Sequence, residues 1–476
     1  MAFGFFKKKQ TADLVFTNGK IYTLDPDLPW ADAVACEEGK IICVGANEDV
    51  EDLIDDDTQV IDLEGKYLLP GFINTHAHPA AKIFADEYLV LSDLWDRDTV
   101  LGTVTDYVDS NPFMDAFFAY GFDEAILEDL SREENRALLD RITEEKPILL
   151  LSRGEGILWT NTVALERVTA MAQQDGVQNI SLNYCLQALE MLDYEGLQEK
   201  MQNIVTGYCE KGFTSVVNAG APEFMNSIYQ DLVMEMHQQD IVRQRNFDSL
   251  QMERNLPAEM VMAHLMHKKT QTMEMDDMAT CDILKLVVGR ERAVGMDEEN
   301  FKNVVKQASE RGFDIMIEAL DKTAFRQCVE AVSEVRDAGY RKNNIIFTCE
   351  KEYKAEDDEF SLDEYSLDNV HFLASANREA ADDYAMIEGK NNIEGIIETM
   401  TQDAAIAFGL EDRLGTIEHG KDADFVIFED NPFEAGNGVT FKKRMAAMLV
   451  MGGKIVYDEE EDVMSQWYDI MAGMHI

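Results

Sequence analysis

The stretch Pro70-Gly-Phe-Ile-Asn-Thr-His-Ala-His-Pro79 joins an apolar run to two histidines, His76 and His78. Residues i and i+2 of a β-strand point to the same side of a sheet, so the two imidazoles are expected to lie together. Two imidazoles can hold one divalent metal ion, and barrel enzymes place their active sites at the carboxyl ends of their strands. The stretch therefore predicts a metal site at the end of a barrel strand; the alternative is a surface pair at a turn.

Outward from this stretch, short apolar runs alternate with amphipathic segments such as 300–311 and 324–338. Alternation of this kind favours βα units around a parallel sheet. Eight apolar runs predict an α/β fold, a closed (β/α)8 barrel of the TIM type. The runs are 67–72, 116–120, 148–151, 214–217, 283–288, 314–317, 344–347 and 370–374.

The segment 224–278 has little strand character and holds ten of the 25 methionines. Adaptable, methionine-rich helices over the mouth of the barrel would fit this composition. The alternative is that methionine is simply common in this chain.

Both ends of the chain have the sequence pattern of β-strands joined by tight turns. Turn signals at Asn18-Gly19 and Glu38-Gly39 predict hairpins near the amino end, and Gly452-Gly453 predicts one near the carboxyl end. We therefore expect residues 12–68 and 415–476 to form one small β-sandwich domain, residues 69–414 to form the barrel, and residues 1–11 to be a frayed leader.

The chain has 476 residues, and 42 Lys and Arg against 92 Asp and Glu give a net charge of −50. So acidic a surface repels nucleic acid and anionic membranes, which excludes both as expected partners. The seven cysteines form no C-x-x-C pair, and no apolar run reaches the length of a membrane span. These features favour a cytoplasmic protein. Walker, G-x-S-x-G and G-x-G-x-x-G motifs are absent, so phosphoryl transfer, serine hydrolysis and dinucleotide binding have no support.

With the motif at His76 and His78, five further stretches resemble the amidohydrolase superfamily of metal-dependent barrel hydrolases. Those in the middle are similar to its amidohydrolase 3 branch, which contains N-substituted formamide deformylase. The likeness covers nearly the whole chain and is looser between residues 181 and 380. The further stretches are Tyr120-Gly-Phe-Asp123, Pro147-Ile-Leu-Leu-Leu151, Trp159-Thr-Asn-Thr-Val-Ala-Leu165, Gly415-Thr-Ile-Glu-His-Gly-Lys-Asp-Ala-Asp-Phe-Val-Ile-Phe428 and Gly452-Gly-Lys-Ile-Val-Tyr457.

The resemblance implies metal ligands at His76, His78 and Lys285, the last in the position of the branch's strand lysine. A lysine inside an apolar strand needs a partner or a modification, because a lone buried ammonium is costly. Lys285 would be either carboxylated, which makes it an anionic oxygen ligand, or paired with a carboxylate. Glu318 stands where the family has a histidine and can still bind a divalent ion.

Other positions depart further from the family pattern. In the region of its second histidine this chain has Thr348 and Cys349, of which the thiolate could ligate a metal. Glu155-Gly156 stand where the branch has Gly-His, so a substrate-facing histidine is missing, and Glu155, Trp159 and Asn161 are expected to shape the substrate pocket. The general-base aspartate is not evident: Asp382-Asp383 lie in a shortened segment, so the catalytic residue stays unassigned.

Two hypotheses follow. The first is a metal-dependent hydrolase that acts on carbon–nitrogen bonds other than peptide bonds in a small amide-type substrate, with one divalent ion, zinc being expected. The second is a degenerate barrel that acts as a binding or partner protein, which the altered ligand positions favour. Homodimerisation stays open in both.

Overall fold

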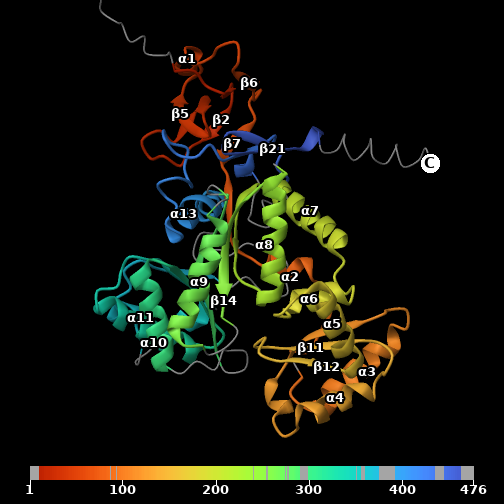
Figure 1. Ribbon diagram of the computed structural model, residues 1–476. Helices are drawn as coiled ribbons and strands as arrows, with labels where there is room; N and C mark the ends of the chain where they lie inside the picture. The colour runs from red at the N-terminus through yellow and green to blue at the C-terminus, as the bar shows by residue number, and fades with distance from the viewer. Residues whose placement is uncertain are drawn as a thin grey trace, which may run out of the picture.

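The computed structural model describes residues 10–461, apart from 86, 93, 240, 253–255, 274, 276–277, 290–297, 350, 355–359, 375–391 and 435–443. Residues 1–9 of the expected leader and the pair Asp382-Asp383 lie outside the described residues. The rest forms a mixed α/β fold in which three groups of strands follow one another along the long axis of the molecule (Figure 1).

Two sheets at one end of the molecule draw strands from both chain ends. The first has the order β5-β4-β1-β6, and the second has the order β21-β20-β19-β7-β2-β3. Phe16 of the first sheet and Phe425 of the second meet edge to face at 6.1 Å within one shared apolar cluster. The strands are β1 (Leu14–Thr17), β2 (Lys20–Tyr22), β3 (Trp30–Ala31), β4 (Ala33–Glu37), β5 (Lys40–Gly45), β6 (Gln59–Asp62), β7 (Tyr67–Pro70), β19 (Phe425–Phe428), β20 (Met448–Met451) and β21 (Lys454–Asp458).

The turns in this part differ in what they connect. Glu38-Gly39 closes the hairpin β4–β5, and Gly452-Gly453 closes the hairpin β20–β21, as the sequence predicts. The hairpin predicted at Asn18-Gly19 is wrong, because β1 pairs with β4 and β6 while β2 pairs with β3 and β7. Asn18 has a φ of 55°, so the turn itself is tight, but it passes the chain from one sheet to the other.

The central layer is a parallel sheet of seven strands in the order β18-β17-β16-β15-β14-β13-β8. One apolar residue from each strand joins a single cluster, which shows that the sheet curls around its own inner face. The short helix α13 (Ala404–Ala407) packs against the same cluster. The strands are β8 (Phe72–Ala77), β13 (Phe213–Asn218), β14 (Arg245–Gln251), β15 (Ala279–Val288), β16 (Asp314–Ala319), β17 (Ile345–Cys349) and β18 (Val370–Ala374). The inner cluster takes Ile73, Val217, Phe247, Ile283, Met316, Ile346 and Leu373 from these strands.

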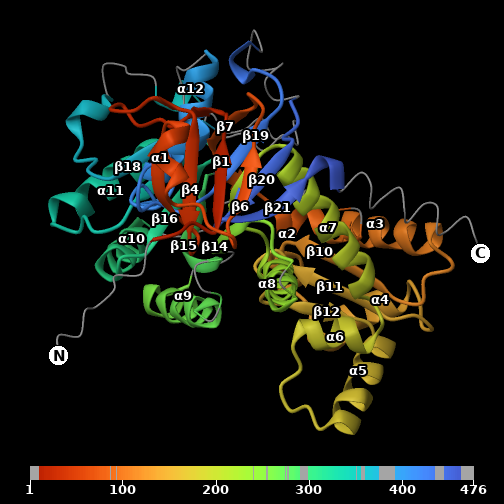
Figure 2. The ribbon, with the colours of Figure 1, turned by 90° about the horizontal axis from the view of Figure 1, so that it is seen from above.

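Helices cover the outer face of this sheet (Figures 1 and 2). Strand β14 lies within the methionine-rich segment, for which the sequence predicted helices alone. The helices of that segment, α8 and α9, lie along the outside of β13, β14 and β15. The helices around the sheet are α2 (Pro79–Ile83), α7 (Tyr194–Glu210), α8 (Glu223–Gln238), α9 (Ala258–Thr272), α10 (Glu298–Arg311), α11 (Lys322–Asp337) and α12 (Ile393–Glu398), followed by a π-helical turn (Thr399–Asp403).

A separate sheet with the order β12-β11-β10-β9 lies to one side of the seven-stranded sheet (Figure 2). It contains the runs at 116–120 and 148–151 that the sequence analysis assigned to the barrel, so that assignment is wrong. Its apolar strands are buried on both faces, on one by its own helices and on the other also by α2, α7 and α8, which gives them the same composition as barrel strands. The elements are β9 (Leu89–Val90), α3 (Arg97–Ser110), β10 (Phe117–Phe122), α4 (Arg132–Asp140), β11 (Ile148–Ser152), β12 (Leu158–Thr160), α5 (Thr162–Asp175) and α6 (Leu182–Ala188).

Arg245, at the start of β14, ties the seven-stranded sheet to the terminal sheets. Its guanidinium donates to both carboxylate oxygens of Asp424, at 2.8 and 2.9 Å, and lies 3.3 Å from Asp422. All three side chains are buried. Such a bidentate pair has the geometry that makes a buried charge tolerable.

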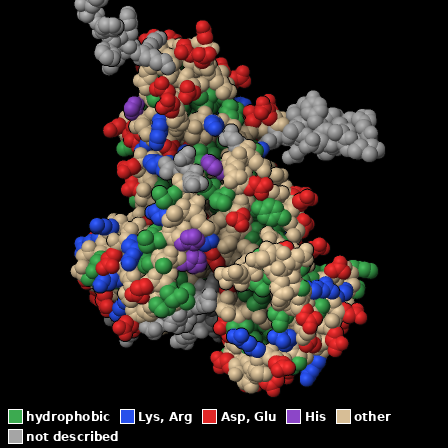
Figure 3. Space-filling view, viewed as in Figure 1, with side chains coloured by type: hydrophobic (Ala, Val, Ile, Leu, Met, Phe, Trp, Pro, Cys, Tyr) green, Lys and Arg blue, Asp and Glu red, His purple; other side chains and the backbone are tan. Residues whose placement is uncertain are grey.

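Acidic side chains are scattered over the visible face, in keeping with the net charge (Figure 3). In the described part of the chain, no helix has the length and the hydropathy that a membrane crossing requires.

Candidate metal centre

His76 and His78 lie at the carboxyl end of β8, where the pairing with β13 contains a bulge. Val216 pairs with Asn74 and Asn218 pairs with Ala77, so β8 has one residue more than β13 over this interval. The Asn74 side chain accepts a hydrogen bond from the His76 backbone N–H at 3.1 Å, which supports the bulge. An extra residue reverses which face the following side chains occupy.

The bulge turns both histidines toward the inner face of the curled sheet. Phe72 and Ala77 belong to the same outer apolar cluster although they are five positions apart, whereas Ile73 belongs to the inner cluster. Because side chains alternate along a strand, the neighbours of Ala77 on either side, His76 and His78, face inward. Both histidines are half-buried there.

The two rings converge on one point. Their centroids are 4.9 Å apart, and Nε2 of His76 lies 3.2 Å from Nε2 of His78. Two nitrogens bound at about 2.0–2.1 Å to one ion, with an angle of about 100–110°, would be about 3.1–3.4 Å apart. The separation of the two nitrogens therefore fits a shared divalent ion, and without an ion it also allows a hydrogen bond between the rings.

The backbone of Gly220 sets the tautomer of His78. Nδ1 of His78 lies 2.7 Å from the Gly220 carbonyl oxygen, which can only accept, so Nδ1 carries the proton. In the neutral ring this leaves a lone pair on Nε2, as a metal ligand needs. Gly220 has a φ of 98°, and a Cβ at this position would stand 2.5 Å from the Gln251 side-chain oxygen. The positive φ favours glycine, and a Cβ here would force the Gln251 side chain to move.

Lys285 and Glu318 form an ion pair on the inner face. Lys285 Nζ lies 3.0 Å from Glu318 Oε2, and the exposed fractions of the two side chains are 0% and 17%. Lys285 is two residues beyond Ile283 and Glu318 two beyond Met316, both of the inner cluster, so both charged groups point inward. An unmodified Lys285 thus has a carboxylate within ion-pair distance.

The histidines and the ion pair lie along the same end of the sheet. Gln251 connects them, because it pairs in register with Lys285 and its side chain lies against Gly220, which bonds His78. Among the described residues, no group of three or more His, Cys, Asp and Glu side chains is arranged to hold a metal ion. The donors present are thus two imidazoles on β8, with Lys285 three strands and Glu318 four strands further along the sheet.

Thr348 and Cys349, considered for the second histidine position, face opposite ways. Thr348 is buried on the inner face and pairs in register with Glu318. Cys349 packs in the outer apolar cluster with Phe325, so its thiol points away from the inner face.

Of the three residues expected in the substrate pocket, Glu155 reaches the sheet end with the histidines. Its side-chain oxygen accepts from the Phe224 backbone N–H at 3.4 Å, at the start of α8, just beyond Gly220. Trp159 donates its indole N–H to the Asn135 carbonyl at 2.8 Å and lines a hollow of about 490 Å³ in the smaller sheet. Asn161 is fully buried and caps α5 by accepting from the Ala164 N–H at 3.1 Å.

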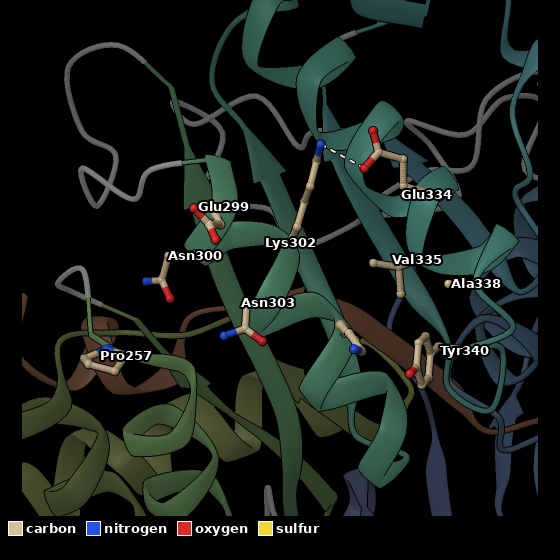
Figure 4. A pocket seen from close by; sticks show the side chains of 10 residues that line it. Pro257, Glu299, Asn300, Lys302, Asn303, Glu334, Val335, Ala338 and Tyr340 are labelled. Atoms are coloured by element: carbon tan, nitrogen blue, oxygen red, sulfur yellow. Dashed lines mark ion pairs between the residues drawn. The ribbon is translucent and has the colours of Figure 1, made fainter.

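A separate groove of about 900 Å³ lies on the outer helices (Figure 4). Lys302 of α10 crosses it to Glu334 of α11, with 2.9 Å between Nζ and Oε2. Its lining belongs to the outer helical layer, so it does not open on the histidine pair.

The family model described as "Amidohydrolase family" matches residues 59–350 and 367–457, which is most of the chain. The chain belongs to the amidohydrolase family. It is 32% identical over 165 residues to the exoenzymes regulatory protein AepA of Pectobacterium carotovorum, covering 34% of this chain and 36% of that protein. It is 27% identical over 161 residues to the N-substituted formamide deformylase of Arthrobacter pascens, covering 33% and 30%.

Among solved structures, an uncharacterized metal-dependent hydrolase of Pyrococcus furiosus is similar, with a TM-score of 0.50 at 14% identity. That likeness covers 88% of this chain and all of the other, and it concerns the fold. The chain spans about a third of the length of the curated relatives described above.

Four residues near the site were not predicted from the sequence, and all lie on β13, β14 or the turn that follows β13: Asn218, Gly220, Asp248 and Gln251. One signal was present: Asn218 is the polar residue that directly ends the apolar run 214–217. Asp248 and Gln251 lie on the strand that was not predicted.

Proposed function

We propose that this amidohydrolase family member is a metal-dependent hydrolase that cleaves a carbon–nitrogen bond, other than a peptide bond, in a small molecule. The observation that carries the proposal is the pair of facing imidazole nitrogens, 3.2 Å apart, with His78 held in the ligating tautomer. The deformylase among the relatives acts on a substituted formamide by its name, which supports an amide-type substrate.

His76 and His78 fit a divalent ion and would hold it, and zinc suits imidazole ligands. Such an ion supplies Lewis acidity and activates water near neutral pH. The chain's own residues contribute the rest: Gly220 keeps the Nδ1 proton on His78, and Lys285 holds the carboxylate of Glu318 at the same end of the sheet. With two imidazoles in the described donor set, we propose one ion per chain.

The proposal includes the finer architecture expected from the sequence. It takes residues 69–414 as one hydrolase domain built around the curled seven-stranded sheet, and residues 12–68 with 415–476 as a β-sandwich. It takes Glu155, whose side chain meets the start of α8, as a substrate contact, with Trp159 and Asn161 supporting the smaller sheet beside it. It takes the cytoplasm as the location.

The test is a hydrolysis assay on the zinc-loaded protein with N-substituted formamides, N-acyl amino acids and cyclic amides, read by amine or acid release. His76→Asn and His78→Asn are the informative variants. His264→Asn is the matched control, because His264 lies on α9 with 42% of its side chain exposed. We expect turnover by the parent protein and by His264→Asn, and at least a 100-fold loss in the other two. Stoichiometric metal without turnover on any substrate would instead favour a binding protein.

A further inference from the structure

A cluster of buried polar side chains lies behind the histidine pair, on the outer face of β13 and β14 under α8. We call Asn218, Asn226, Gln230 and Asp248 the Asp248 cluster. Asn218, Asn226 and Asp248 are 3% exposed or less. Buried Lys268 lies beside it, with its Nζ 3.0 Å from Gln230 Oε1, and apolar clusters form the rest of the helix–sheet interface. Well-packed apolar residues are often as stable as a buried charged network, so fold stability alone does not account for this cluster.

The Asp248 carboxylate is surrounded by donors. Oδ1 accepts from Asn218 Nδ2 at 2.7 Å and from the Ser249 backbone N–H at 2.9 Å. Oδ2 accepts from Asn226 Nδ2 at 3.4 Å and from the Gln230 amide. Burial raises the pKa of Asp248 to about 6, against the opposing effect of these hydrogen bonds. The carboxylate thus accepts from four donors and fixes the direction of each side-chain amide around it.

The orientation of the Asn218 side-chain amide in turn fixes its hydrogen bond to the turn after β13. Because its Nδ2 faces Asp248 and the Asn226 oxygen, its Oδ1 faces the other way and accepts from the Gly220 N–H at 3.1 Å. The Gly220 carbonyl then accepts from His78 Nδ1 at 2.7 Å. Three consecutive hydrogen bonds therefore join a fully buried carboxylate to the ring nitrogen that decides the tautomer of His78.

We propose that Asp248 is a positioning residue for His78, acting through Asn218 and the backbone of Gly220. It keeps the Gly220 carbonyl directed at Nδ1, so that Nε2 of His78 presents its lone pair beside Nε2 of His76. The role of Asp248 in metal binding rests on the proposed function. Its effect on the tautomer of His78 does not depend on that function. Partners of ligating histidines beyond the metal itself typically change metal affinity by 10–100-fold.

The test compares Asp248→Asn and Asn218→Ala with Asp314→Asn. Asp314 is a matched control: it is also a largely buried acid of the same sheet, with a pKa raised to about 7 by burial. It begins β16, at the end of the sheet away from Lys285 and Glu318, where it accepts from the Asn344 N–H at 2.8 Å. Zinc affinity is measured by competition with a chromophoric chelator, and the tautomer of His78 by the ¹⁵N shifts of its ring in metal-free protein.

We expect a loss of zinc affinity of about 10–100-fold in Asp248→Asn and Asn218→Ala, and none in Asp314→Asn. The ¹⁵N shifts of His78 should lose the fixed Nδ1–H pattern in the first two variants only. Unchanged affinity and tautomer in both, or equal losses in the control, would overturn the proposal. If Asp248→Asn does not fold, Asn218→Ala carries the same test. If the parent protein binds no zinc, the proposed function fails while the ¹⁵N measurement still decides the positioning role.

Discussion

Replacing either partner of the Lys285–Glu318 pair should destabilise the protein strongly. Replacing both should lower the free energy of unfolding by less than the sum of the two single losses. The pair is 3.0 Å apart, and the exposed fractions of the two side chains are 0% and 17%. Leaving one charge of such a pair alone costs about 3–5 kcal/mol, so Lys285→Met and Glu318→Gln should each lose about that much. The double variant leaves neither charge behind and should lose no more than one single, which makes the coupling about 3 kcal/mol or more.

The sign of this coupling identifies the form of Lys285. An ammonium attracts Glu318, so each single substitution leaves the other charge uncompensated. A carboxylated lysine would place two negative groups side by side in metal-free protein. Removing Glu318 would then relieve repulsion, and the coupling would vanish or change sign.

The assay is equilibrium urea unfolding of chelator-treated protein, with the midpoint compared at constant m-value. Lys302→Met and Glu334→Gln provide the matched cycle, because that pair is 2.9 Å apart but its side chains are 28% and 63% exposed. Exposed pairs contribute about 0–1 kcal/mol, so the control coupling should be small. Additive losses at Lys285 and Glu318, or a coupling no larger than the control, would refute the buried ion pair.

Three further results follow from the described contacts. Arg245→Met should lower the free energy of unfolding by about 3–5 kcal/mol, read by urea denaturation, because it leaves Asp424 charged and buried. Gly220→Ala should lower the thermal midpoint and the zinc affinity together, since its φ is 98° and its Cβ would meet Gln251. Asp314 has its pKa raised to about 7 from 3.8, so the folded state binds its proton more tightly. The stabilisation of the folded state by protonated Asp314 is therefore fully present below about pH 4 and is lost as the pH rises through about 7. Parent protein should therefore lose stability relative to Asp314→Asn across that interval; parallel pH profiles would contradict this.

Local sequence rules predicted what depends on neighbouring residues. The i, i+2 spacing at His76 and His78 brought two rings together, and the glycine-containing turns at Glu38-Gly39 and Gly452-Gly453 closed hairpins. The same kind of signal failed at Asn18-Gly19, because a turn residue sets the local backbone but not which sheet the next strand joins.

Strand β14 was not predicted because its sequence, Arg245-Asn-Phe-Asp-Ser-Leu-Gln251, is polar although the strand is almost wholly buried. Its polar groups are satisfied by residues distant in sequence, such as Asp424 for Arg245 and Asn218 for Asp248. Apolar periodicity cannot detect a buried strand whose polar groups find tertiary partners. Conversely, β10 and β11 have the composition of barrel strands and lie in another sheet, since composition reports burial and not topology.

Local patterns could not predict the Lys285–Glu318 ion pair or the hydrogen bonds that connect Asp248 to His78, for the same reason. The hydrogen bond from His78 to Gly220 joins residues 142 positions apart through a backbone carbonyl, which no side-chain motif encodes. Glu318 was identified as a departure from the family pattern, but its partnership with Lys285 depends on the register of β15 and β16.

The most direct test of the central claim is the metal content of the purified protein and of His76→Asn/His78→Asn, measured by elemental analysis after dialysis against trace zinc. Ligands that hold the ion are required for its retention. We expect about one divalent ion per parent chain and almost none in the double variant, with both proteins folded. An equal metal content in the two proteins, or a folded parent protein that retains no ion, would contradict it.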